Sequence, residues 1–348
     1  MLVKSPPQVG AVEDAPPRGR NATRSLGLLI SVALLAAVVV ASIALGARAI
    51  PVGDVWHGVF TPSGTDNDTV IRELRIPRTL LGLVVGAALG LAGAVLQALT
   101  RNPLADPSLL GINAGASAGV VTAISLLGVT SLTGYVWFAF AGAAVVAVAV
   151  YALGGHRSAT PIRLTLAGTA VTAALFGYVQ AVQLLDTAAL DRMRFWTVGS
   201  LASASMSTFW KVLPCLAVGT LLALALARPL NAVAMGDDTA RALGANLTRT
   251  RTLAMVAATL LCGGAVAACG PIVFVGLMVP HMVRSFTGPD QRWILPYAAV
   301  LSPVLLLGAD VVGRVVARPG ELQVGIVTAL IGGPVFIHLV RRRRMAQL

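Results

Sequence analysis

The chain has 348 residues, of which 56% are hydrophobic and only 11% are charged. A soluble globular domain carries about 25% charged residues, so this chain cannot cover an ordinary water-facing surface. Intrinsic disorder, collagen, a coiled coil and a disulfide-stapled secreted domain are excluded on the same grounds. The composition therefore indicates a polytopic membrane protein.

The formal net charge is +12, which in a soluble protein would suggest nucleic acid as a partner. Lys4 and Lys211 are the only lysines, and the arginines are scattered singly between apolar runs until Arg341–Arg344. That distribution is typical of loops held at a membrane surface by the positive-inside bias. We expect membrane lipid around the chain and no nucleic acid bound to it.

A helix that crosses the hydrocarbon core of a bilayer needs about 20 apolar residues. Residues 107–156 and 252–283 are too long for one helix and contain turn signals near Gly128–Gly134 and at Cys269-Gly270-Pro271. The sequence therefore predicts an all-α membrane protein with about ten transmembrane helices, in the ranges 26–47, 79–100, 107–156 (two helices), 164–185, 207–227, 252–283 (two helices), 293–309 and 322–340. Residues 1–25 are expected to form a disordered Pro- and Arg-rich tail before a ten-span domain at 26–344.

An even number of spans places both termini on one side of the membrane. With the N-terminus inside, 17 of the 26 basic residues fall on the cytoplasmic side. The positive-inside bias therefore favours cytoplasmic N- and C-termini, although the outer group Arg72, Arg75 and Arg78 opposes it.

The sequence lacks the residues needed for ATP hydrolysis, metal binding and ion-coupled transport. Neither lysine follows a glycine, so the chain has no phosphate-binding loop of the Gly-Lys-Ser/Thr type and is not expected to be an enzyme. The four histidines are dispersed, and we expect no metal site and no cofactor. Buried ionisable residues would mark an ion-coupled secondary transporter, but only Asp310 approaches a span.

Three long segments contain polar, glycine and proline residues in patterns that a generic membrane helix bundle does not need. The first joins Arg75-Ile-Pro-Arg78 to the glycine-rich run Gly86–Gly93 and to Arg101-Asn-Pro-Leu-Ala-Asp-Pro107. The second is Met235-Gly-Asp-Asp-Thr-Ala-Arg-Ala-Leu-Gly244, and the third begins with Gly270-Pro-Ile-Val-Phe-Val-Gly-Leu-Met-Val-Pro-His281. The chain resembles, from Val52 to Arg344, the FecCD family of permease subunits of ABC importers for iron-siderophores, haem and cobalamin.

The resemblance implies a bacterial inner-membrane importer in which this chain has three kinds of protein partner. Two permease subunits, as a homodimer or heterodimer, would form the translocation path between them. Two cytoplasmic ABC ATPase subunits would drive it, and an extracytoplasmic substrate-binding protein would deliver the cargo. A ferric siderophore is the expected cargo, with haem and cobalamin as alternatives, and an ion-coupled secondary transporter is the rival class.

The family pattern assigns binding-protein docking to Arg75, Arg78 and Arg314, at span ends expected to face outward. Arginine suits this role because its planar guanidinium can bind a carboxylate with two hydrogen bonds. The alternative is that these arginines simply face water or lipid headgroups.

The segment near 235–246 resembles the family's coupling helix, which inserts in a groove on the ATPase. Gly236, Ala240, Arg241 and Gly244 are the positions carried over, because small residues allow close approach and Arg241 can reach polar groups. An ordinary amphipathic loop helix is the alternative.

Two loops correspond to those that close the inner end of the family's pore. The positions carried over are Asn102 and Leu104 in the first loop, and Thr160 and Ile162 in the second. Both loops contain proline and could instead be simple turns. In the second loop, Pro161 departs from the small hydroxyl residue often found there in the family.

Thr165, Thr169 and Thr172 recur at helical spacing along the span 164–185. Such a polar stripe would suit the wet translocation path that the resemblance implies. Threonine hydroxyl groups also commonly bond to their own helix backbone, which is the alternative explanation.

Overall fold

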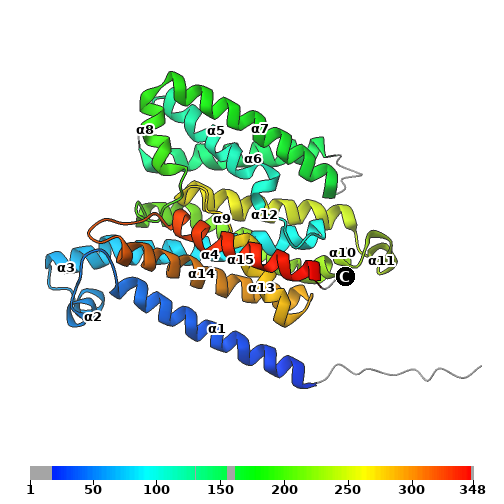
Figure 1. Ribbon diagram of the computed structural model, residues 1–348, viewed down its shortest axis with the longest axis horizontal. Coiled ribbons are helices and arrows are strands. Elements are labelled where there is room, and N and C mark those ends of the chain that lie inside the picture. Colours follow the sequence, from blue (N-terminus) through cyan, green and yellow to red (C-terminus); the bar gives the residue numbers. More distant parts are fainter. Residues whose placement is uncertain (1–17, 130, 155–160, 346–348) are drawn as a thin grey trace, which may run out of the picture.

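The computed structural model describes residues 18–345 apart from 130 and 155–160, and the described part is an all-helical bundle (Figure 1). Seven of its helices are long and apolar enough to cross a membrane. Their bounds are α1 Arg18–Ala44, α4 Ile76–Thr100, α6 Leu132–Leu153, α7 Pro161–Leu185, α9 Met206–Ala225, α12 Leu247–Cys269 and α14 Gln291–Val316.

Three further helices, α5 (Ile112–Ser125), α13 (Val275–Thr287) and α15 (Val324–Met345), coincide with the remaining apolar segments. Each of the ten predicted segments therefore corresponds to one helix, and the predicted all-α membrane fold is confirmed. Shorter elements connect them: α2 Val52–Phe60, α3 Asp66–Thr69, a π-helical turn Val70–Arg75, a 3₁₀ turn Pro107–Leu110, α8 Thr187–Trp196, α10 Ala227–Ala234 and α11 Asp237–Ala242.

Both predicted interruptions of the long apolar runs are present, and each has a local cause. Helix α5 ends at Ser125, and α6 restarts with Ser131 at its N-cap, where the side chain accepts a hydrogen bond from the Gly134 amide. Helix α12 ends at Gly270, whose φ of +74° is readily adopted only by glycine.

The N-terminal tail is shorter than predicted. Helix α1 begins at Arg18, so residues 18–25 are helical rather than disordered, and residues 1–17 lie outside the described part of the chain. The reason lies in contacts with other helices: the Arg24 guanidinium donates to the Thr287 carbonyl, and Tyr297 donates to the Arg24 carbonyl at 2.6 Å.

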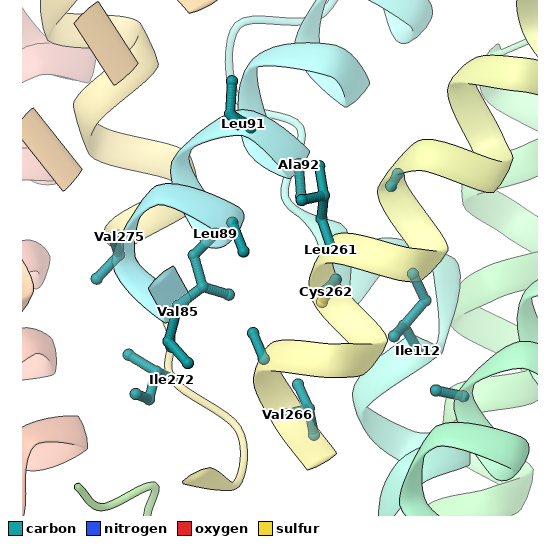
Figure 2. Packing of buried hydrophobic residues seen from close by; sticks show 14 of the residues in the cluster. Val85, Leu89, Leu91, Ala92, Ile112, Leu261, Cys262, Val266, Ile272 and Val275 are labelled. Atoms are coloured by element: carbon teal, nitrogen blue, oxygen red, sulfur yellow. The ribbon is translucent and has the colours of Figure 1, made fainter. Parts of the chain in front are cut away.

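Helix α4 forms the centre of the bundle and is buried along most of its length. Figure 2 shows its residues Val85, Leu89 and Ala92 facing side chains of α12 such as Leu261 and Val266. The glycines of α4 let other helices approach closely: a Cβ on Gly86 would lie 2.6 Å from the Pro303 Cα of α14. Small residues serve this purpose where lipid removes the hydrophobic force between helices.

The bundle has two distinct ends, visible in Figure 1. Helices α10 and α11 lie at one end, together with the start of α1 and the end of α15; we call this the α11 end. Helices α2, α3 and α8 lie at the opposite end, which we call the α2 end. The two described termini therefore lie at the same end of the bundle.

Candidate functional site

The predicted docking arginines lie together at the α2 end, but they are buried. Arg75, Arg78 and Arg314 are only 4%, 8% and 2% exposed. The three side chains are therefore not free at the surface, because they have internal partners that sequence reasoning missed, and their docking role stays a prediction.

Arg75 and Arg314 complete the C-terminal end of helix α1. The Arg75 Nη1 donates to the Ile43 and Ala44 carbonyls at 2.9 and 2.6 Å, and the Arg314 Nη1 donates to the Leu45 carbonyl at 2.9 Å. The last carbonyl groups of a helix have no partner within the helix, and they carry partial negative charge. The two guanidinium groups donate hydrogen bonds to these carbonyls, and their positive charge offsets the partial negative charge of the helix end.

Asp310 of α14 holds the cluster together by binding two arginines. The Arg78 Nε lies 3.1 and 3.0 Å from its two oxygens, and the Arg314 Nη2 lies 3.0 Å from Oδ2. Arg78 also pairs with Glu321 at 2.7 Å. Asp310 is fully buried, and its oxygens are occupied by guanidinium donors rather than open to an ion pathway.

A cavity of about 230 Å³ opens beside this cluster. Its charged lining consists of the exposed Arg48, the three buried arginines and Glu321. The cavity thus borders the buried arginines, and Arg48 is the exposed member of its basic lining.

The predicted coupling segment contains helix α11 at the opposite end. Gly236 precedes it with a φ of +111°, and Gly244 follows it with a φ of +77°, so both glycines have conformations that other residues rarely adopt. Arg241 is exposed and pairs only loosely with Asp238 at 3.2 Å. Ala240, in contrast, is fully buried with Val233 and Leu247, so within this chain its small side chain serves the packing of α11.

The predicted gate residues also lie at the α11 end. The Asn102 Oδ1 accepts a hydrogen bond from the Leu104 amide at 3.0 Å, which makes a compact turn and leaves the Leu104 side chain 37% exposed. Ile162, in the first turn of α7, is 72% exposed. Thr160 falls outside the described residues.

The threonine stripe on α7 is only partly open. The Thr169 side chain is exposed and donates to the Thr165 carbonyl at 2.9 Å, as the backbone-bonding alternative expects. The Thr172 hydroxyl is buried, and it lies 3.4 Å from the position that a Cβ on Gly111 would take. The three threonines therefore do not share one exposed face.

The exposed faces of two spans differ in composition. On α1, the exposed residues between Leu26 and Ala44 are all apolar: Leu26, Leu29, Ile30, Val32, Ala33, Leu34, Ala36, Ala37 and Val40. On α7, the exposed face includes Thr169, Gly177 and Gln180 among apolar residues. Lipid accounts for the first face but is a poor solvent for the amide of Gln180.

Helix α8 contributes residues that the sequence reasoning missed. Its N-cap Asp186 accepts hydrogen bonds from the Ala189 and Ala188 amides, and the first of these chiefly holds the pKa of the Asp186 carboxyl below its ordinary value. Arg194 lines a cavity of about 330 Å³ with Gln180 and Gln183 of α7, and Arg192 lines another of about 230 Å³. The charge run Asp191–Arg194 was the available signal.

Asp237, Arg101 and Arg251 form a second missed cluster, at the α11 end. The Arg251 Nη2 lies 2.9 and 2.8 Å from the two oxygens of Asp237, and the Arg101 Nη2 pairs with the same carboxylate. Desolvation opposes ionisation, but the hydrogen bonds from Arg251 and Arg101 hold the pKa of the Asp237 carboxyl below its ordinary value. Among the described residues, no group of three histidine, cysteine or acidic side chains could hold a metal ion.

Comparison with known proteins agrees with this architecture. The chain matches the FecCD transport family over residues 34–342. It is 44% identical over 323 residues to the ferric enterobactin transport system permease protein FepD of Escherichia coli (strain K12), covering 92% of this chain and 96% of FepD. It is 40% identical over 281 residues to the cobalamin import system permease protein BtuC of Halobacterium salinarum, covering 80% of this chain and 75% of that protein.

A solved structure, described as a metal-chelate type ABC transporter in an inward-facing conformation, has the same fold. Its TM-score is 0.81 at 28% sequence identity, over 91% of this chain and 99% of that chain. The bundle and these matches define a multi-pass membrane permease. The chain belongs to the FecCD transport family.

Proposed function

We propose that this chain is the membrane-spanning subunit of an ABC importer that takes up a ferric siderophore. The observation that carries the proposal is the 44% identity to FepD, which extends over nearly the full length of both chains. Relatives with other named cargoes, such as cobalamin, are 40% identical or less, so haem and cobalamin stay the alternatives.

Energy would come from separate ATPase subunits that bind the α11 end. The sequence has no phosphate-binding loop of its own, because neither Lys4 nor Lys211 follows a glycine. Helix α11 offers a contact surface in which Arg241 is exposed between the turns at Gly236 and Gly244. The excess of basic residues in the loops of this end favours the cytoplasm, and both termini would then be cytoplasmic.

The translocation path would lie against the exposed face of α7, between this chain and a second permease subunit. Support comes from the contrast with α1, because the exposed amide of Gln180 needs a partner or water that lipid cannot supply. The cavities beside Gln180, Arg192 and Arg194 would form the outer part of this path. At the inner end, Asn102, Leu104 and Ile162 would close it.

An extracytoplasmic binding protein would dock at the α2 end. Because Arg75, Arg78 and Arg314 are held by internal partners, an acidic side chain of the binding protein would meet Arg48 first, at the cavity beside the cluster. The docking role of the three buried arginines would then be to give that cavity a positive potential.

The proposal is tested by uptake of radiolabelled iron in cells with and without this chain, supplied separately with catecholate, hydroxamate and citrate chelates. We expect loss of uptake of at least one ferric chelate and its return when the chain is restored. Unchanged iron uptake together with lost cobalamin or haem uptake would assign the other cargo.

A second arm separates the importer from an ion-coupled transporter. Proteoliposomes that contain the chain and its ATPase should accumulate the chelate only when ATP is present on the side of the membrane that the ATPase faces. Uptake that follows a proton or sodium gradient without ATP would instead support the secondary-transporter class.

A further inference from the structure

The ion-pair cluster at the α11 end joins three segments that are distant in sequence. Asp237 is the first residue of α11, Arg251 lies in α12, and Arg101 follows the last residue of α4. Arg251 and Arg101 both bind the Asp237 carboxylate, and the Arg101 Nε also donates to the Val233 carbonyl of α10 at 2.8 Å. One carboxylate thus connects the helix α11 to the loop that contains Asn102 and Leu104.

Arg101 has an unusual backbone at this junction. Its φ of +52° belongs to the left-handed region, which non-glycine residues rarely adopt. Such a conformation persists where surrounding contacts determine it. Here the guanidinium is fixed at both Val233 and Asp237, and the loop 101–107 starts from this fixed point.

Helices α10, α11 and α12 contact one another and form a small unit, although α10 and α12 also pack against α4. Val233, Ala240 and Leu247, one from each helix, form a separate buried apolar cluster. Arg251 adds a polar contact within this unit, because its two hydrogen bonds reach both oxygens of Asp237. Arg101 is the member of the ion-pair cluster that comes from outside the unit.

The neighbouring carboxylate shows that this arrangement is specific to one position. Asp238 is adjacent to Asp237, but its side chain is fully exposed and pairs only with Arg241, one turn further along the same helix. Asp237 therefore connects separate segments, whereas Asp238 connects none.

We propose that the Asp237–Arg101 pair is the mechanical link between α11 and the loop 101–107, so that the two move together. This inference rests on the proposed function, in which α11 receives the motion of the ATPase and the loop closes the inner end of the path. Arg101 and Asp237 act as positioning residues and contact neither ATP nor cargo.

The sharpest variant is Arg101→Gln, because it removes the loop's contact while Arg251 still holds Asp237 against α12. Measured in the assembled importer in proteoliposomes, ATPase binding and ATP hydrolysis should stay at the parent level. Chelate uptake per ATP hydrolysed should fall about ten-fold, within the range of known allosteric couplings. Asp237→Asn should show the same loss, and the matched control Asp238→Asn should behave as the parent.

A distance measurement tests the link without relying on activity. Spin labels at the exposed positions 104 and 243 should give one narrow distance distribution, with and without nucleotide, in the parent and in Asp238→Asn. Arg101→Gln should broaden the distribution or shift it when nucleotide binds.

Parent-like distances and parent-like uptake per ATP in Arg101→Gln would overturn the inference. Failure of the parent importer to move any ferric chelate would instead overturn the proposed function, so the two failures are distinguishable.

Discussion

The two charged clusters at opposite ends of the bundle use the same chemical groups in different surroundings. At the α2 end, Asp310 and Arg314 are 0% and 2% exposed, and the contacts of the cluster hold α1, α4 and α14 together. At the α11 end, the side chains of Asp237 and Arg101 are 33% and 36% exposed, and they connect a short helix to a loop. Burial makes the first cluster costly to break, whereas the second is partly hydrated and lies at the surface of the bundle.

The comparison suggests that the two ends of the bundle have different mechanical roles. The α2 end would be a fixed scaffold that anchors α1 to α4 and α14. The α11 end would transmit motion, because its ion pairs join a short exposed helix to the loop 101–107. The predictions below compare the two ends, from the largest expected effect to the smallest.

Asp310→Ala should have the largest effect. It leaves the Arg78 and Arg314 guanidinium groups buried without their shared carboxylate, and breaking a buried ion pair costs about 3–5 kcal/mol in the free energy of unfolding. Thermal unfolding in detergent should show a strongly lowered midpoint or no folded protein. Glu321→Ala is the matched control and should lose much less, because the Glu321 side chain is 33% exposed. Equal midpoints for Asp310→Ala and the parent would contradict the scaffold role.

Arg75→Ala should be the next most damaging change. It removes the hydrogen bonds to the Ile43, Ala44 and Arg48 carbonyls, and hydrogen bonds to charged groups contribute about 1.5–3 kcal/mol. The control is Arg72→Ala, because Arg72 also donates to backbone carbonyls but is exposed. We expect a lower unfolding midpoint for Arg75→Ala alone, and similar midpoints for both variants would show that burial of the guanidinium is unimportant.

Arg241→Glu should leave the fold intact and affect assembly. The Arg241 side chain is 65% exposed, and surface substitutions usually change stability by less than about 0.5 kcal/mol. Co-purification of the ATPase and its transport-stimulated turnover should both fall, while the unfolding midpoint stays at the parent value. Normal co-purification and turnover would remove α11 from the coupling role.

Arg48→Glu should give the smallest effect, a weaker affinity for the binding protein. An exposed ion pair contributes about 0–1 kcal/mol and is screened by salt, so the loss should be a few-fold at low salt and vanish at high salt. The affinity would be measured in nanodiscs at two salt concentrations. Charge reversal at Arg75 and Arg314 is not a suitable test of docking, because both side chains are buried and their loss would disturb the fold.

Sequence reasoning predicted the spans well because an apolar run of sufficient length leaves few alternatives to a membrane helix. The breaks at 126–131 and 270–274 followed from glycine and proline in the same way. The burial of the arginines could not be predicted, since an arginine at a span end usually faces water. Arg78 meets Asp310, which lies 232 positions further along the chain, and Arg75 binds backbone carbonyls, which carry no sequence signal.

In the coupling segment, too, the sequence predicted the helix but not the contacts of its side chains. The polar pattern of 235–246 and its two glycines predicted a short helix between spans, and α11 lies there. The pattern did not show that Ala240 faces inward, or that Asp237 rather than Asp238 binds arginines from two other segments. Both facts depend on how α10, α11 and α12 pack.

The most direct test of a fixed α2 end and a moving α11 end is hydrogen–deuterium exchange of the assembled importer with and without a non-hydrolysable ATP analogue. We expect exchange to change together in residues 101–107 and 235–251, and to stay constant in residues 42–48, 75–82 and 306–316. A change in those latter three segments, or a change in α11 without one in the loop 101–107, would contradict the account.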